Sequence, residues 1–420
     1  MSDAALSLIV LAAAVALFVW NRLPVGVVAV LTALALAATG VLTPEQAIAG
    51  FGDPVVLFIA TLFVLSEGLQ ASGVTTWAGQ QLLARAGTGR TRVLVALMAL
   101  SAALAALVTP NGAAAAALPV MVLVARHAGV ATSRLAIPLA YAASAGALLT
   151  LSGSPVNVIV SDALQETTGT RFGFFEFAAV GAPLVLVTVV VAVLCGDRLL
   201  PDRGEPPRGA GPPVQAPPER LGARAAGAVA VLVATIVMLA SGALPPAVAG
   251  LVGAVGMVLV RAVPASRALR ALPWETLVLI AGLVPLSVAI ADSGAADLLA
   301  DVVVGVVPAG EGHLLLAALF VLTALLGQFI SNAATVLVVT PIALAAAEGV
   351  GISAAPVLML VATAGAASFL TPIATPANMI VRGPGRYQFG DYWRLGLVMM
   401  LAWLVVATLL IPVVWPLTPA

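Results

Sequence analysis

Long apolar segments, separated by short stretches of glycine, proline and charged residues, run along almost the whole chain. The strict alternation typical of membrane β-strands is absent, and a helix needs roughly 20 residues to cross a hydrocarbon core of about 30 Å. The segments predict ten helical crossings, near 4 to 20, 24 to 40, 54 to 70, 135 to 160, 176 to 196, 223 to 241, 246 to 261, 274 to 291, 354 to 381 and 393 to 415. The pattern therefore predicts an all-α polytopic membrane protein.

Two further apolar stretches, 93 to 126 and 313 to 347, are interrupted midway by polar residues. The interruptions are Thr109-Pro110-Asn111-Gly112 and Ser331-Asn332-Ala333. Each arm has about 14 to 18 residues, which is marginal for a full crossing. A polar tip at the centre of a bilayer is costly unless it lines a cavity, so we expect two re-entrant hairpins.

Composition agrees with this pattern. Hydrophobic residues make up 62% of the chain and charged residues 9%, with a mean hydropathy of +1.15, whereas a soluble domain carries about 25% charged residues. A soluble fold is therefore excluded. With a formal net charge of zero, we expect the lipid bilayer, and no nucleic acid, among the partners.

The arginines test the layout, because inner loops of membrane proteins are enriched in basic residues. No basic residue precedes the first apolar run, and Arg22 follows it, which predicts a retained first helix that begins outside. Starting outside, 17 of the 18 arginines fall on inner loops and only Arg171 falls outside. The charged residues of the outer loop 292 to 312 are all acidic, namely Asp292, Asp297, Asp301 and Glu311. We expect a bacterial inner (plasma) membrane protein with both termini extracytoplasmic.

The sequence also repeats internally. Asn111 is followed by Asn332, and Ser154-Pro155-Val156-Asn157 by Thr375-Pro376-Ala377-Asn378, each after 221 residues, while Gly181 aligns with Gly396 after 215. Each half holds five crossings and one re-entrant hairpin, and an odd number of crossings inverts the second half. The predicted parts are a first inverted repeat 1–196 (hairpin 93–126, broken helix 135–160), a cytoplasmic linker 197–222, and a second repeat 223–420 (hairpin 313–347, broken helix 354–381).

Inverted repeats place a binding site at broken helices near the midplane. Helix N-termini there carry free amides and partial positive charge, which suits an anion, while proline frees carbonyls that coordinate a cation. A single break of this kind could be a simple kink in a membrane helix. Four breaks in symmetric pairs, each with an asparagine, are poorly explained in that way. Two structural alternatives stay open, namely that Ser331 is a helix cap and that Asn378 brackets its loop.

At these residues the chain resembles the divalent anion:sodium symporter family of the ion transporter superfamily. The family signature is a Ser-Asn-Thr hairpin tip followed by a helix break with proline and asparagine. The second repeat is close to it, the first is looser, and Gly112 and Ala333 replace both tip threonines.

The resemblance implies a set of binding residues. It implies substrate binding by Asn111, Ser154, Ser331, Asn332 and Thr375. It implies sodium binding by Asn111, Gly153, Ser154, Asn332, Ala374 and Thr375. Asn157, Asn378 and Glu67 are secondary candidates on the pattern of the residues themselves. It also implies a homodimer that moves its substrate domain by an elevator motion.

Glu67 is the one acid that we place inside a crossing, where acids are functional candidates by default. It lies near the inner end, and its repeat mate is Val288. These features favour an interfacial or paired role over ion coupling.

Together these features predict a secondary active transporter of a small, divalent anion such as sulfate or a dicarboxylate. Neutral polar groups at the breaks suit sodium as the coupling ion, and we expect no other cofactor. The alternative is the large membrane subunit of a binding-protein-dependent (TRAP-like) carrier. A channel or a membrane enzyme is disfavoured, because the predicted membrane region offers no histidine cluster or acid pair for catalysis.

Overall fold

The computed structural model describes residues 2–20, 22–75, 77–78, 81, 89–203, 222–305 and 311–418, except the side chains of His127 and Val303. Within these ranges the regular structure is helical and contains no strand. The helices of the first half are α1 (Asp3–Trp20), α2 (Val25–Ala38), α3 (Pro44–Ala49), α4 (Pro54–Ala71), α6 (Arg90–Leu107), α7 (Pro110–Ala128), α8 (Ala136–Gly146), α9 (Pro155–Thr168) and α10 (Ala178–Leu199). Those of the second half are α11 (Ala223–Ser241), α12 (Pro246–Leu259), α13 (Ala265–Arg270), α14 (Trp274–Asp292), α15 (Ala295–Val304), α16 (Gly312–Leu326), α17 (Asn332–Val350), α18 (Ala354–Gly365), α19 (Pro376–Arg382) and α20 (Tyr392–Val414).

Eight helical segments of the described chain are long and apolar enough to cross a membrane. Helices α2 and α12 have only 14 residues each, about 21 Å, and are therefore shorter than the crossings predicted there. The second hairpin arms α7 and α17 have 19 residues each, more than predicted, because each helix runs on to a left-handed glycine, Gly129 or Gly351. Length alone therefore does not separate hairpin arms from crossings in this chain.

The order of helices recurs along the chain. Helices α2, α3 and α9 each begin 221 residues before α12, α13 and α19. Contacts recur in the same way, since α2 packs on α14 as α12 packs on α4, and α19 packs on α7 as α9 packs on α17. The division at residues 197–222 stays a prediction, because 204–221 lie outside the described residues.

Helices α10 and α20 show the relative direction of the two halves. Trp403 Nε1 donates to Thr188 Oγ1 at 2.9 Å, and Trp415 Nε1 donates to Glu176 Oε1 at 2.7 Å. The positions rise along α20 while they fall along α10, so the two helices run antiparallel. Opposite directions of equivalent helices support the predicted inversion.

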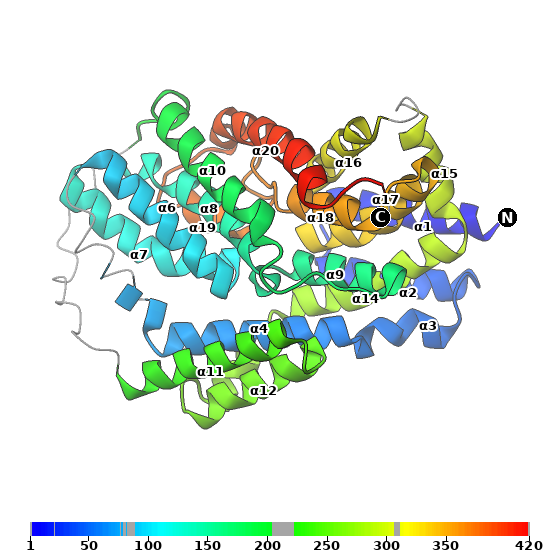
Figure 1. Cartoon of the computed structure of the whole chain (residues 1–420), viewed down its shortest axis with the longest axis horizontal. Coiled ribbons are helices and arrows are strands. Elements are labelled where there is room, and N and C mark those ends of the chain that lie inside the picture. The colour runs from blue at the N-terminus through cyan, green and yellow to red at the C-terminus, as the bar shows by residue number, and fades with distance from the viewer. Residues whose placement is uncertain are drawn as a thin grey trace.

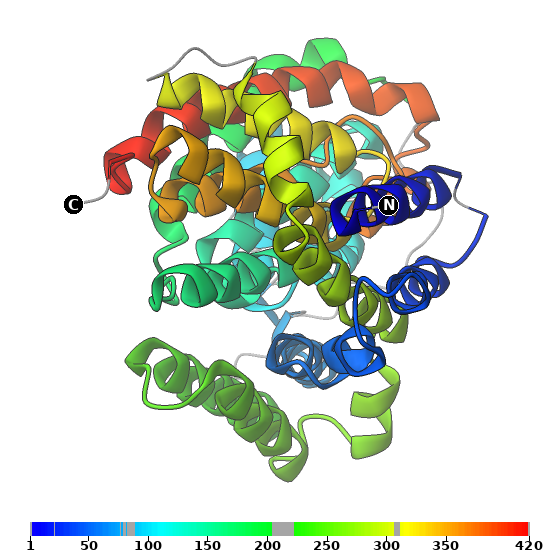
Figure 2. The same ribbon diagram turned by 90° about the vertical axis from the view of Figure 1, so that its right-hand side faces the viewer.

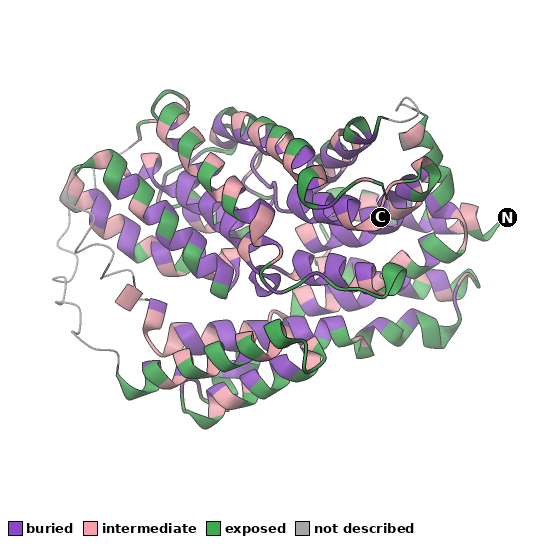
Figure 3. Ribbon diagram, viewed as in Figure 1, coloured by how far each residue is buried: buried purple, intermediate pink, exposed green. Residues whose placement is uncertain are grey.

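Burial is concentrated in the centre of the molecule. Every residue of α8 is buried, and so is most of α18 (Figure 3). By contrast, α11 and α12 lie beside α4 along one edge (Figures 1 and 2), and large apolar side chains such as Leu194, Val237, Leu259 and Val413 are exposed. An apolar exterior around a packed interior is what a bilayer requires of a multi-pass protein.

Predicted inner loops meet at one end of the helices. Arg134 pairs with Asp197 and Asp202, and Arg203 pairs with Asp391 at 2.6 Å. Arg171, the one arginine predicted outside, pairs with Asp162 instead. These pairs support the predicted sorting of loops into two sides, while the orientation of the termini remains a prediction.

Candidate functional site

Asn157 and Asn378 each hold a helix break closed from within. The Asn157 amide Nδ2 donates to the carbonyls of Ala147 and Thr150, both at 2.8 Å. The Asn378 amide donates to Ser368 and Thr371, at 2.8 and 3.0 Å. In both repeats the acceptors lie seven and ten residues before the asparagine, so Asn378 brackets its loop, as the structural alternative left open for it requires.

In both brackets the side-chain amide oxygen of the asparagine is left without a hydrogen-bond donor in the described part of the chain. Both asparagines are fully buried, and their Oδ1 atoms have no hydrogen-bond partner among the described residues. A buried acceptor without a donor is costly and rare in proteins. Each helix break therefore offers one buried neutral oxygen to a cation or a water molecule.

The breaks are fixed to their surroundings in matching ways. Thr150 Oγ1 donates to the carbonyl of Ala106 at 2.5 Å, and Thr371 Oγ1 donates to that of Gln328 at 3.2 Å. Gly181 of α10 abuts the carbonyl of Leu148, and Gly396 of α20 abuts that of Phe369, so closely that a Cβ atom at either glycine would collide with the oxygen. Gly181 and Gly396, which the sequence aligns, therefore make the same kind of close contact with a backbone carbonyl.

The hairpin tips are helix N-termini capped by hydroxyls. Thr109 Oγ1 accepts from the Gly112 amide at 3.2 Å, and Ser331 Oγ accepts from the Ala334 amide at 3.3 Å. Ser331 is therefore a helix cap.

The two caps also set the register of the hairpins. Thr109 and Ser331 are 222 residues apart, as are the internal prolines Pro119 and Pro341 of α7 and α17. The predicted equivalence of Asn111 and Asn332 is wrong by one residue, because these residues take the second and first positions of their helices. Asn111 is therefore equivalent to Ala333 of the second repeat, since both are the second residues of their helices.

Asn111 joins the first hairpin tip to the second helix break. Its Oδ1 accepts from the Ala377 amide at 3.1 Å and from Thr375 Oγ1 at 3.5 Å. Asn332 Oδ1 accepts from Ser368 Oγ at 2.7 Å, beside the same break. Asn111, Thr375, Asn332 and the adjoining buried Ala374 therefore gather around the second break.

The predicted residues of the first break have local roles. Ser154 Oγ caps α9 by accepting from the Val156 amide at 3.3 Å. Gly153 packs against the carbonyl of Ala147 with no room for a Cβ atom. The N-terminus of α9 thus begins beside a tightly folded break, as α19 does in the second repeat.

Three residues at the second break escaped sequence reasoning. Gln328 Nε2 donates to the carbonyl of Ala367 at 3.1 Å, and its Oε1 accepts from the Leu370 amide at 2.9 Å. Tyr141 of α8 donates to the carbonyl of Phe369 at 2.6 Å, and Tyr392 donates to that of Asn378 at 2.8 Å. The one available signal was Gln328 itself, a polar side chain at the end of an apolar arm.

Glu67 lies apart from the helix breaks. Its Oε1 accepts from Arg267 Nε of α13 at 2.5 Å, and 18% of its side chain is exposed. The paired, interfacial role favoured for Glu67 agrees with this geometry.

Comparison with known proteins places the chain in a family. A profile described as "Citrate transporter" (CitMHS) matches residues 15–364 and 307–418. The transporter YfbS of Escherichia coli (strain K12) is 24% identical over 97% of this chain and 98% of its own, and the sodium-dependent dicarboxylate transporter SdcS of Staphylococcus saprophyticus is 23% identical over 94% and 83%. A probable sodium/sulfate cotransporter of Chlamydomonas reinhardtii is 29% identical over 38% of this chain and 19% of its own.

Solved structures share the fold. The YdaH transporter of Alcanivorax borkumensis superposes with a TM-score of 0.63 at 17% identity, covering 97% of this chain and all of that one. MtrF of Neisseria gonorrhoeae gives 0.61 at 12% identity, covering 92% and 86%. The expected family resemblance is confirmed, and the chain belongs to the citrate transporter family, as a multi-pass membrane transporter and not an enzyme.

Proposed function

We propose that this protein is a sodium-coupled secondary active transporter of a small, multiply charged anion, namely a di- or tricarboxylate or sulfate. The observation that carries the proposal is the pair of asparagine brackets. Each leaves a buried, neutral Oδ1 atom at a helix break, and neutral oxygen ligands of this kind suit Na⁺.

The anion is assigned to the helix N-termini at the same place. Helices α7, α9, α17 and α19 all begin at a hairpin tip or a break, where backbone amides and the helix dipole favour negative charge. Asn111, Ser154, Ser331, Asn332 and Thr375 remain the proposed substrate ligands. Sodium-dependent dicarboxylate and sodium/sulfate transport in the names of relatives supports the substrate class.

Contacts between helices support an elevator motion. Helices α1, α2 and α4 pack with α11, α12 and α14, while α6 to α10 pack among themselves and with α16 to α20. The two groups meet where α14 and α15 pack on α17 and where α4 packs on α9. We propose that the first group is the fixed scaffold of a homodimer and that the second group carries the site across the membrane.

The test is uptake of labelled citrate, succinate and sulfate by the purified chain in liposomes, with and without an inward sodium gradient. We expect saturable uptake of one of the three that requires sodium. Equal uptake without sodium would refute the coupling, and no uptake of any of the three would favour a carrier that needs further subunits.

A further inference from the structure

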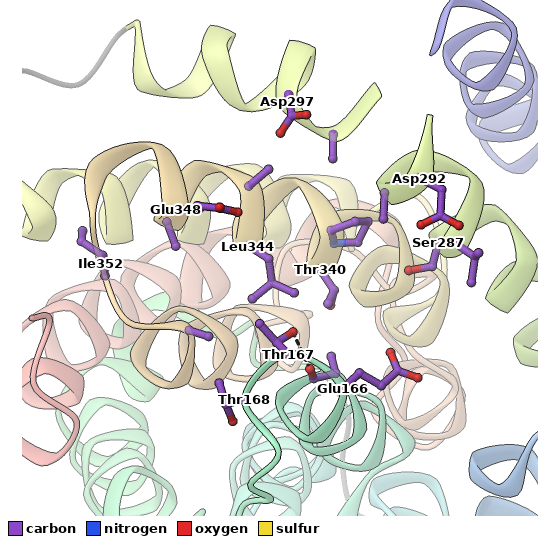
Figure 4. A pocket seen from close by; sticks show the side chains of 18 residues that line it. Glu166, Thr167, Thr168, Ser287, Asp292, Asp297, Thr340, Leu344, Glu348 and Ile352 are labelled. Atoms are coloured by element: carbon purple, nitrogen blue, oxygen red, sulfur yellow. Dashed lines mark hydrogen bonds between the residues drawn. The ribbon is translucent and has the colours of Figure 1, made fainter. Parts of the chain in front are cut away.

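A cavity of about 870 Å³ opens between α9, α14, α15 and α17. Figure 4 shows four carboxylates around it, and its lining contains no basic residue. They are Glu166, Asp292, Asp297 and Glu348. All four are exposed, and none of them forms an ion pair within the described part of the chain.

A buried hydroxyl also lines this cavity. Thr340 of α17 is only 5% exposed, and its Oγ1 has no hydrogen-bond partner among the described residues. In Figure 4 the Thr340 side chain lies between α17 and α9, inside the ring of acids. The next residue, Pro341, has no N–H group, so α17 also lacks its usual bond to the carbonyl of Leu337. The Thr340 hydroxyl is therefore a buried polar group that lacks a hydrogen-bond partner within the described ranges and lies in the same cavity as four carboxylates.

The cavity lies where the two groups of helices meet. Asp292 ends α14 of the scaffold group, and Asp297 lies on α15, which packs on both α14 and α17. Glu166 and Glu348 lie in the last turns of α9 and α17. All four belong to segments predicted on the outer side. Thr340 is eight residues from the N-terminus of α17, about 12 Å along the helix, so the cavity is separate from the hairpin tip.

The charge of the cavity selects the sign of its occupant. A cleft lined by one sign of charge concentrates counter-ions and repels ions of the same sign. A divalent anion is therefore disfavoured here unless cations are already present.

The spacing of the acidic side chains also bears on whether the cavity suits a monovalent or a divalent cation. Among the described residues, no three acidic, histidine or cysteine side chains converge in a way that holds a metal ion. Calcium takes six to eight oxygen ligands, several of them carboxylate. The spread carboxylates with one deep hydroxyl suit a loosely held alkali cation.

We infer that this cavity is an outer binding site for a monovalent alkali cation, in which Thr340 supplies a hydroxyl ligand and the four carboxylates supply the attracting field. The inference deepens the proposed function, because the ion it concentrates is the proposed coupling ion. Occupation of the site reduces the negative charge of the entrance before the anion arrives.

Equilibrium binding of ²²Na⁺ to the purified full-length protein, without any anion substrate and at constant ionic strength held with choline chloride, tests the site directly. The variants are Thr340→Val, which keeps the shape, and the double change Asp292→Asn with Asp297→Asn. We expect each to weaken sodium binding at one class of site by about three- to tenfold, as loss of one ligand or two nearby charges does. The matched control is Asp301→Asn, which changes an exposed acid of α15 outside the cavity lining and leaves binding unchanged.

Unchanged sodium binding in both variants would overturn the site, as would an equal loss in Asp301→Asn. Displacement of sodium by micromolar calcium would overturn the monovalent assignment. Binding that falls in the variants while uptake proves independent of sodium leaves the site standing and refutes the proposed coupling instead, so the two failures are distinguishable.

Discussion

The two buried Oδ1 atoms of Asn157 and Asn378 are the polar atoms of the helix breaks that lack a hydrogen-bond partner among the described residues. Each asparagine uses its amide group to close a loop, and its Oδ1 is left without a donor. Side chains that only close a loop have no need of a second, unpaired polar atom at the same place. The residue therefore combines a structural bracket with a candidate ion ligand, and substitution can separate the two roles.

Asn378→Ala removes both roles, whereas Asn378→Asp keeps an oxygen and loses the two donors. We expect both changes to lower stability, by about 1–3 kcal/mol for the unpaired carbonyls of Ser368 and Thr371. The aspartate variant should nevertheless bind sodium more tightly than the alanine variant. Thermal melting in detergent and ²²Na⁺ binding measure the two effects, and equal sodium affinity of both variants would assign Asn378 to the bracket alone.

Glu67→Gln tests the acid predicted within a crossing. Its partner Arg267 is 58% exposed, and ion pairs of that kind contribute about 0–1 kcal/mol. We expect sodium activation of uptake to keep the same half-saturating concentration in the variant. A curve shifted by several-fold would show that Glu67 belongs to the coupling machinery.

At the scale of elements, the helix breaks depend on helices from outside their own loop. Helix α20 approaches the second break through Gly396, which leaves no space for a side chain beside the carbonyl of Phe369. Tyr141 of α8 donates to the same carbonyl. The second break is thus shaped by both halves of the chain.

Gly396→Ala should therefore displace the break. Backbone cannot yield as a flexible side chain does, so we expect a loss of about 1–3 kcal/mol or more and loss of transport. Gly390→Ala is the matched control, because open space surrounds that position six residues earlier. Melting temperature and uptake are the measurements, and equal behaviour of both variants would show that the break tolerates movement.

The sequence predicted the helix breaks and the hairpin tips, because proline, glycine and hydroxyl residues act on the backbone near them. It failed where distant segments meet. The shift of the hairpins to 222 residues follows from caps that only the helix register reveals. The roles of Gln328 and Tyr141 depend on carbonyls 39 and 228 residues away, which no local pattern encodes.

At the scale of the whole molecule, the predicted inverted repeat relates the two halves by a pseudo-two-fold axis. Thr188 and Trp403 are 215 residues apart, the offset that relates α10 to α20, and they bond to each other. In an inverted repeat, a contact between equivalent positions is expected close to the axis. An inverted repeat of this kind gives an inward and an outward arrangement of similar energy.

The proposed motion makes a prediction about contacts between the two groups of helices. Gln70 of α4 reaches the first hairpin tip, where its Nε2 lies 3.0 Å from the position of a Cβ atom on Gly112. With Cys195, the one cysteine of the chain, replaced by serine, Gln70→Cys and Gly112→Cys can be joined by a short bifunctional reagent. We expect the joined protein to keep ²²Na⁺ binding and to lose uptake, since the scaffold then holds the tip in one position.

The control joins two helices within the scaffold. A Cβ atom on Gly26 of α2 lies 3.5 Å from Val278 Cβ of α14, within the range of about 3.5–4.5 Å that a disulfide requires. Gly26→Cys with Val278→Cys should therefore form a disulfide and leave uptake intact, because both helices belong to the fixed scaffold. Uptake that survives the link between α4 and the hairpin tip would contradict an elevator motion along this boundary, whereas uptake lost in both proteins would show that the scaffold itself must flex.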